Sequence, residues 1–181
     1  MSQPAILPNE IKCGKYGTLF NYRSGLYLNW RRTDPWYFLW KKVWWDSHVP
    51  ALHPLMWQNA KTGLIYRPAS TRQLETRLHR LTDLGSIPPP VQGWFPPAEA
   101  PFAYFPHDVG YGCGGLWTSM FVAGPWRFTP MTRWELDDLC LRDILDAGGT
   151  SLPRRTVIYD CVRVGGTVNF CPTKPDEEDM R

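Results

Sequence analysis

The order of apolar and polar positions predicts strands in the first part of the chain. Between residues 16 and 45, short aromatic runs alternate with polar positions and are broken by turn residues. Aromatic segments of period two with turn residues between them are typical of β-strands joined in hairpins. The segment GLIYRPAS, residues 63–70, predicts one further strand. Residues 48–57 carry two prolines and are expected to form a loop.

A helical period is clearest between residues 130 and 147. Thr132 followed by Glu135 predicts a capping box at the start of this helix. The two glycines at 148 and 149 predict its end, because glycine adopts the backbone conformation that closes a helix.

Three other segments complete the expected secondary structure. A shorter helix is expected over residues 98–111, weakened or restarted at Pro106. Residues 71–81 are ambiguous, since leucines at helical spacing run directly into a loop with three successive prolines. Residues 155–170 predict one or two strands. The whole pattern therefore predicts a single α+β domain, in which an antiparallel, aromatic-rich sheet accompanies two main helices packed together.

Two charges lie on the apolar side of the 130–147 helix. On a wheel that advances about 100° per residue, Asp137 falls in the apolar stripe and Arg133 lies about 40° from it. The other members of the stripe are Trp134, Cys140, Leu141, Ile144 and Leu145. The opposite half carries Glu135, Asp138, Arg142, Asp143 and Asp146. A charge that faces a core is costly unless it is paired. A local pair with Arg133 is one alternative, but pairs with the base first are weak, so a partner from another segment is favoured.

The expected partner lies in the stretch FPHDVGYGCGG, residues 105–115. In a helix, His107 and Tyr111 share one face, while Asp108 points about 100° away. Asp137 and Tyr111 could then orient the imidazole, and Asp108 could hold a cation or contact a ligand. A histidine held by a buried carboxylate is the usual arrangement for a general base. The alternative is a structural histidine whose hydrogen bonds only fix the packing of two helices.

Length and composition narrow the class of protein. A chain of 181 residues, 43% of them apolar, is most simply one folded domain. The net charge of +3 is too small to indicate a nucleic-acid partner. Five cysteines without a CxxC pair favour reduced thiols over a disulfide framework. The sequence predicts neither a signal peptide nor a transmembrane segment, because it has no basic start followed by an apolar run and no long apolar stretch.

Four blocks of the sequence stand in a defined order. They are TDLGSIP at 82–88, HDVGY at 107–111, RWELD at 133–137 and IYDCVRVGG at 158–166. These blocks resemble a domain family of unknown function that is carried by tailed bacteriophages and prophages. The likeness covers residues 64–167, with residues 1–63 as a tryptophan-rich extension of the same fold and residues 168–181 as a C-terminal tail.

The resemblance implies a phage context without an established activity. In that context the protein would be a component of the virion, in its tail, baseplate or neck, made in the cytoplasm of the bacterial host. Its partners would be other virion proteins, and a homo-oligomer stays open as an alternative.

The HDVGY block with a distant aspartate is also similar to the site of the secreted calcium-dependent phospholipases and of the parvovirus capsid phospholipase domain. That likeness implies His107 as the base for water and Asp108 as a calcium ligand. Tyr111 and Asp137 would orient the ring, with Arg133 beside them.

A metal site at this place would need more ligands than Asp108. Calcium takes six to eight oxygen ligands, so Asp83, Ser86 or loop carbonyls would have to contribute. The alternative for Asp83 and Ser86 is local turn hydrogen bonding. The phospholipases place a glycine-rich calcium loop before the histidine, whereas here the glycines follow it. A divalent cation such as calcium is therefore the cofactor that the hydrolase hypothesis would require.

Two classes of function remain open from the sequence. The first is a structural component of the virion, in which the polar cluster fixes helix packing. The second is a metal-assisted hydrolase of a lipid or a cell-envelope polymer, with His107 as general base. The aromatic and basic block at residues 29–45 either packs within hairpins or meets another protein.

Overall fold

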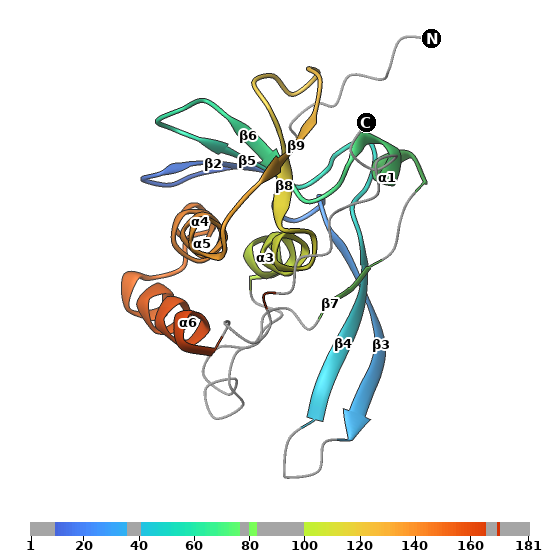
Figure 1. Cartoon of the computed structure of the whole chain (residues 1–181), viewed down its shortest axis with the longest axis vertical. Helices are drawn as coiled ribbons and strands as arrows, with labels where there is room; N and C mark the ends of the chain where they lie inside the picture. Colours follow the sequence, from blue (N-terminus) through green and yellow to red (C-terminus); the bar gives the residue numbers. More distant parts are fainter. Residues whose placement is uncertain (1–9, 36–40, 77–79, 83–99, 166–169, 171–181) are drawn as a thin grey trace.

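The computed structural model describes residues 10–35, 41–76, 80–82, 100–165 and 170, without the side chains of residues 29–35, 41–45, 80–82 and 165. Strands dominate the part before residue 83, and helices dominate the part after residue 100 (Figure 1). Asp83, Ser86 and most of the TDLGSIP block lie outside the described residues.

The larger sheet has six strands in the order β1-β2-β5-β6-β8-β9, and every neighbouring pair is antiparallel. The strands are β1 (Ile11–Cys13), β2 (Gly17–Phe20), β5 (Met56–Asn59), β6 (Ile65–Arg67), β8 (Gly115–Ser119) and β9 (Arg127–Pro130). All five residues of β8 are buried, because this strand lies inside the sheet and also contacts a helix.

A second sheet has three antiparallel strands in the order β3-β4-β7. They are β3 (Tyr27–Pro35), β4 (Lys41–His48) and β7 (Arg80–Thr82). The long β3–β4 hairpin extends away from the helices (Figure 1). The predicted hairpin between residues 16 and 45 is therefore present. Whether the tryptophan side chains of residues 29–45 are core or interface lies outside the described residues.

The helices form two layers beside the larger sheet. The helical segments are α1 (Thr71–Thr76), α3 (Pro101–Cys113), α4 (Arg133–Asp137), a π-helical segment (Asp138–Ile144), α5 (Leu145–Ala147) and α6 (Leu152–Gly165). The α4, π-helical and α5 segments form one continuous helix, called the α4–α5 helix. This helix and α3 lie under the sheet, and α6 packs on the outer side of the α4–α5 helix (Figure 1).

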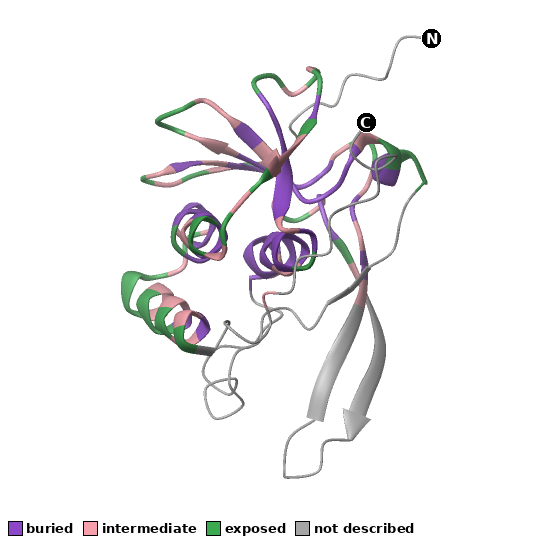
Figure 2. Cartoon of the chain, in the orientation of Figure 1, coloured by how far each residue is buried: buried purple, intermediate pink, exposed green. Residues whose placement is uncertain are grey.

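The fold class predicted from the sequence is confirmed, since the molecule is an α+β protein with antiparallel sheets and packed helices. Helix α3 is buried along most of its length, while α6 exposes much of its outer side (Figure 2). Among the described helices, none combines the length and the apolar character that a bilayer crossing requires.

Local sequence signals account for both ends of the continuous helix that runs from the start of α4 to the end of α5. The Thr132 hydroxyl accepts a hydrogen bond from the Glu135 N–H, and the Glu135 carboxylate accepts one from the Thr132 N–H at 2.7 Å. This is the predicted capping box, which satisfies two amide donors that a helix start leaves open. At the other end, Gly149 has a positive φ of 86°, a conformation that glycine adopts without strain.

The structure overturns the prediction of strands over residues 155–165, because residues 152–165 form helix α6, and residues 166–169 of that prediction lie outside the described residues. The β-branched residues that suggested strands follow a helical period in their burial: Ile158 and Val162 are buried, whereas Val157 and Val164 are exposed. Tertiary contacts on one face of the helix outweigh the intrinsic preference of these residues.

Two details of the helix predictions are also corrected. Pro106 lies inside α3 rather than restarting it, and Pro101 occupies the start. Within residues 71–81, which the sequence left ambiguous, helix α1 ends at Thr76 and a strand that was not predicted, β7, begins at Arg80.

The helical wheel is wrong for two residues of the α4–α5 helix. Trp134 is 57% exposed although it was placed in the apolar stripe, and Asp143 is buried although it was placed on the polar half. A wheel assumes one covered face, whereas α3, α6 and β2 all contact this helix, and its middle turns are π-helical.

Two glycines of α3 give a matched test of the packing between α3 and α4. A Cβ at Gly110 would lie 2.4 Å from Cδ2 of the fully buried Leu136, so Gly110→Ala is expected to lower the free energy of unfolding by about 1–3 kcal/mol. A Cβ at Gly112 meets no described atom within 4 Å, so Gly112→Ala is expected to raise the free energy of unfolding by about 0.5–1 kcal/mol. Urea denaturation of both variants measures the difference, and equal effects would contradict this packing.

Candidate functional site

A buried carboxylate and a buried imidazole meet between α3 and α4. Nε2 of His107 lies 2.9 Å from Oδ1 of Asp137. The His107 side chain is 5% exposed and that of Asp137 is fully buried. Because an ionised carboxylate only accepts hydrogen bonds, Nε2 carries the proton and donates a hydrogen bond to Asp137. The contact predicted between these two segments is therefore present.

Tyr111 completes the hydrogen bonding of the same carboxylate oxygen. It follows His107 by one helical turn, and its hydroxyl donates to Oδ1 of Asp137 at 2.5 Å. The rings of His107 and Tyr111 have centroids 4.0 Å apart and are tilted by 36° relative to one another. The ring of Phe170 contacts Tyr111 edge-on from the far side. The spacing of HDVGY on α3 places His107 and Tyr111 on one face, as expected, but the Tyr111 hydroxyl donates to Asp137 and not to the imidazole that it was expected to orient.

Arg133 joins this cluster from the first turn of α4. Its Nε donates to the Tyr111 hydroxyl at 3.2 Å and lies 3.8 Å from Oδ2 of Asp137. Its Nη2 donates to the backbone carbonyls of Val162 and Arg163, which belong to the last turn of α6. Arg133 therefore has both the local partner considered from the sequence and partners on a third helix.

Arg163 is a member of the cluster that sequence reasoning missed. Its Nη1 lies 3.6 Å from Oδ2 of Asp137, and its Nη2 donates to Oδ1 of Asp138 at 2.9 Å. Its guanidinium carbon also lies 3.9 Å from the centre of the Trp134 ring, a cation–π contact with an exposed indole. We call His107, Tyr111, Arg133, Asp137 and Arg163 the Asp137 cluster.

A signal for Arg163 was present in the sequence but was assigned to the wrong structure. Arg155, Tyr159 and Arg163 recur every four residues, which places them on one face of a helix. Arg155 pairs with Asp146, and Tyr159 and Arg163 bind Asp138. The same spacing also keeps residues on one face of a strand, so it did not by itself distinguish a strand from a helix. As helix residues they bind the acids of the α4–α5 helix.

The electrostatics of the cluster favour the charged forms of its central pair. Burial alone would raise the pKa of Asp137, but hydrogen bonds from His107 and Tyr111, with the charge of Arg163, lower it. Burial alone would lower the pKa of His107, but the carboxylates of Asp108 and Asp137 raise it. Burial and the hydrogen bond to Asp137 raise the pKa of Tyr111, so its hydroxyl stays protonated.

The second ring nitrogen of His107 has a different environment. Nδ1 has no hydrogen-bond partner within the part of the chain that the structure describes, and the nearest acidic oxygen is Oδ1 of Asp108 at 3.7 Å. The Asp108 side chain is 21% exposed, so it lies between this nitrogen and the surface. When Nε2 donates to Asp137, neutral His107 carries its lone pair on Nδ1 and can accept a proton there.

Access to the cluster is restricted. Two cavities are lined by described residues elsewhere in the molecule, and His107, Asp108, Tyr111 and Asp137 line neither of them. The described residues also contain no group of three histidine, cysteine or carboxylate side chains that could hold a metal ion. Asp83, the second ligand expected from the sequence, lies outside the described residues. The cation site of Asp108 and Asp83 therefore stays a prediction.

No protein-family profile, curated protein or solved structure matches the chain. The likeness to the phage-borne family therefore rests on the four sequence blocks, and the likeness to the phospholipases rests on the HDVGY block with Asp137. Residues 158–165 of the last block, expected as a strand, belong to helix α6.

Removal of the central carboxylate gives the largest expected loss of stability. Asp137→Asn should lower the free energy of unfolding by about 3–5 kcal/mol, because it leaves buried cationic groups without their counter-charge. Asp160→Asn is the matched control, since Asp160 is exposed on α6, and it should change stability by less than about 0.5 kcal/mol. Urea denaturation at pH 7 measures both. A small loss for Asp137→Asn would contradict the assigned role.

The raised pKa of His107 gives a pH-dependent contribution to stability. Its ordinary pKa is about 6.5, so the stabilisation by protonated His107 is fully present below that value. It is lost as the pH rises through the higher folded-state pKa. The difference in unfolding free energy between the native protein and His107→Gln should therefore be larger at pH 6 than at pH 9. Denaturation across this range checks the sign, and a difference that grows with pH would contradict it.

Proposed function

We propose that this protein is a structural component of a bacteriophage particle, and that the Asp137 cluster is its internal connection between three helices. The observation that carries the structural role is the closure of the cluster: Asp137 is fully buried, and the His107 side chain is 5% exposed. The phage context is supported by the resemblance of the four sequence blocks.

The cluster is suited to fixing helix positions because its five members come from three helices. His107 and Tyr111 come from α3, Asp137 and Arg133 from α4, and Arg163 from α6. Hydrogen bonds to charged groups are about twice as strong as neutral ones and depend on direction. A protein that must keep its shape within an assembly gains rigidity from such a network.

Mass spectrometry of purified particles tests the structural proposal. Particles are purified from a host that carries the phage encoding this chain, and the chain is expected to co-purify with them at a constant ratio to the other virion proteins. A phage carrying Asp160→Asn serves as the control for handling. Absence of the chain from particles that are otherwise complete would overturn the proposal.

A second candidate function is a metal-assisted hydrolase, and one observation favours it. Nδ1 of His107 is oriented by Asp137 on the opposite side of the ring, has no described hydrogen-bond partner and lies near Asp108. In this role Nδ1 takes a proton from water as the water oxygen attacks a carbonyl carbon, and the proton passes to the leaving group. Asp137 stabilises the imidazolium that forms. Asp108 would contribute to holding the cation that polarises the carbonyl.

Two substitutions separate the candidates. As a hydrolase, the protein should release fatty acid from phospholipid vesicles with calcium present, or cleave purified cell-envelope polymer. Both Asp108→Asn and His107→Gln should then abolish the activity, and the native rate should rise with pH through the raised pKa of His107. As a purely structural protein, it should show no turnover, and His107→Gln should only lower the melting temperature. Turnover that survives His107→Gln would exclude the general-base role.

A further inference from the structure

The turn between β8 and β9 is exposed and almost wholly apolar. Residues 120–126 read MFVAGPW, with no charged, hydroxyl or amide side chain among them. Phe121 is 70% exposed and Met120 is 54% exposed, and Ala123 and Pro125 are exposed beside them. Turns of soluble proteins are normally polar, and a run of exposed apolar residues marks an interaction surface. We call residues 120–126 the apolar turn.

The neighbouring turn between β5 and β6 has the usual polar chemistry instead. Its Lys61 and Thr62 are exposed, and their N–H groups donate to the carboxamide oxygen of Asn59. The two turns lie side by side, because β6 pairs with β8 and a Cβ on Gly63 would come 4.0 Å from Cε of Met120. Two turns at the same end of one sheet thus differ in character, so the fold does not itself require the apolar composition.

Hydrogen bonds hold the apolar turn in one shape. The Phe121 N–H donates to the Ser119 hydroxyl at 3.2 Å, and the Gly124 N–H donates to the Phe121 carbonyl at 3.0 Å. At the base of the turn, Nε1 of the buried Trp126 donates to the carbonyl oxygen of Val122 at 3.3 Å. The backbone that carries the exposed phenyl ring is therefore already ordered, so that binding through this ring costs little further conformational entropy.

The charges within the two hairpins are all positive. Residues 56–67 and 115–130 contain Lys61, Arg67 and Arg127, and they contain no aspartate or glutamate. Lys61 and Arg127 are exposed, the first on the neighbouring turn and the second directly after the apolar turn. Such a distribution of charge attracts an anionic partner to this end of the sheet.

The acids that act on these strands belong to the α4–α5 helix. Glu135 and Asp143 supply the negative charges that raise the pKa of Tyr66 on β6, after the larger effect of burial. The Glu135 carboxylate accepts the N–H of Thr132 in the capping box, and Asp143 pairs with Arg142 at 2.7 Å. Both acids are thus bound within their own helix and not by the cations of the two hairpins.

A buried cation lies beneath the apolar turn. The Arg67 guanidinium carbon is 4.0 Å from the centre of the Trp126 ring, and Nη2 of Arg67 donates to the Thr71 hydroxyl at 2.8 Å. Nε of Arg67 has no hydrogen-bond partner among the described residues. Burial lowers the pKa of Arg67 to about 9, so the side chain is still charged at pH 7. At 2% exposure it contacts no ligand, and its contribution is to the positive field.

The position of the apolar turn favours a lipid surface over a protein pocket. The turn extends beyond the sheet and away from the helices (Figure 1). None of its residues lines either of the two cavities mentioned above. In a membrane surface the anionic headgroups lie outside the apolar chains, so a protruding apolar tip with cations set behind it meets both layers. A protein partner would instead need a pocket shaped for this tip.

We propose that the apolar turn docks the protein on a bilayer that contains anionic lipids. Met120 and Phe121 insert among the headgroups and upper acyl chains, while Lys61 and Arg127 lie against the anionic headgroups. The insertion is shallow, because a single turn carries it. The site uses no residue of the Asp137 cluster and requires no turnover, so its failure is distinguishable from the failure of either function proposed above.

Sedimentation of the full chain with lipid vesicles tests the docking. The protein should bind vesicles of phosphatidylglycerol and phosphatidylcholine in equal parts, and it should bind them more weakly as salt increases. Met120→Ser with Phe121→Ser should weaken this binding on the order of a hundredfold, because both inserted side chains are lost. Leu52→Ser with Val164→Ser is the matched control, since it removes two exposed apolar side chains outside the turn, and it should leave the affinity within about twofold.

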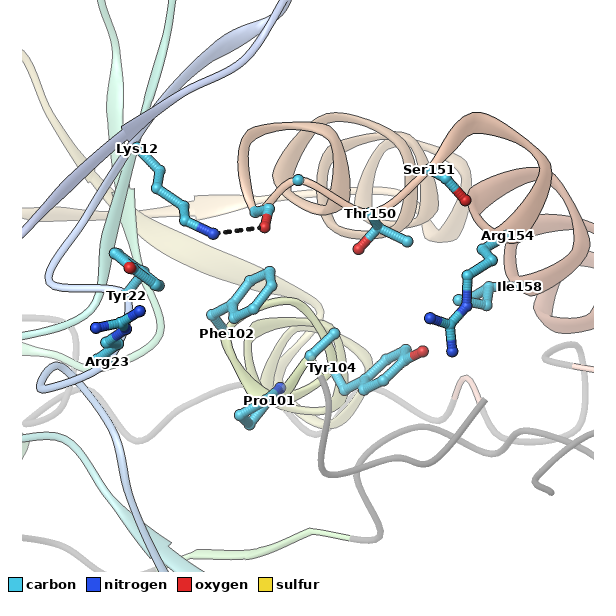
Figure 3. Close-up of a pocket in the computed structure, with 13 residues that line it drawn as sticks. Lys12, Tyr22, Arg23, Pro101, Phe102, Tyr104, Thr150, Ser151, Arg154 and Ile158 are labelled. Carbon is cyan, nitrogen blue, oxygen red and sulfur yellow. Dashed lines mark hydrogen bonds between the residues drawn. The ribbon is translucent and has the colours of Figure 1, made fainter. Parts of the chain in front are cut away.

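A second pair of variants tests the cations. Lys61→Gln with Arg127→Gln should weaken binding to the mixed vesicles on the order of tenfold or more, and should leave the weaker binding to phosphatidylcholine alone unchanged. Arg23 and Arg154 line a separate cavity of about 710 Å³ between the first strands and the starts of α3 and α6 (Figure 3). Arg23→Gln with Arg154→Gln removes the same charge outside the two hairpins and should leave the affinity within about twofold.

Three results would overturn the proposal: no binding to the mixed vesicles, full binding by the Met120 and Phe121 variant, or an equal loss in a variant and its control. No vesicle binding, together with loss of a Phe121→Ser chain from assembled particles, would assign the turn to a protein partner. Should the double serine variant fail to fold, amide shifts of the native protein on addition of anionic bicelles decide, since they should concentrate at residues 60–64 and 119–127.

Discussion

The hydrogen bond between Asp137 and His107 is the interaction on which the arrangement of the helices depends. A carboxylate without solvent exposure is stable only when donors surround it. Here His107 and Tyr111 supply donors from α3, and Arg133 and Arg163 supply positive charge from α4 and α6. The need to neutralise the buried Asp137 carboxylate thus favours this arrangement of the three helices.

The contact between α3 and α4 was predictable from the sequence because both segments carry strong local signals. The capping box fixed the phase of α4, and the spacing of His107 and Tyr111 fixed one face of α3. An inward charge then required a partner, which left few alternatives. The contribution of α6 was not predictable in the same way. Its β-branched residues suggested strands, whereas burial of Ile158 and Val162 and ion pairs with the acids of the neighbouring helix accompany the helical form.

The cavity of Figure 3 shows a second limit of sequence reasoning. Lys12, Tyr22 and Arg154 are far apart in the chain, and no motif joins them. Their approach follows from the packing of β1 and β2 beside the ends of two helices. Local periodicity can place a residue on a face, but only the tertiary fold brings residues from separate faces together. The polar cluster and the basic cavity lie along the same helix α3, which contributes the first turns to one and the later turns to the other.

The bonds from Arg133 to the last carbonyls of α6 close a loop in the chain. Arg133, which begins α4, binds the end of α6, so the first and last residues of segment 133–163 are in direct contact. Release of α6 from such a closed segment carries an added cost, because it removes the charge of Arg163 from Asp137 at the same moment. Amide exchange in α6 should therefore occur with that of α4 as one cooperative unit, although α6 is the more exposed of the two.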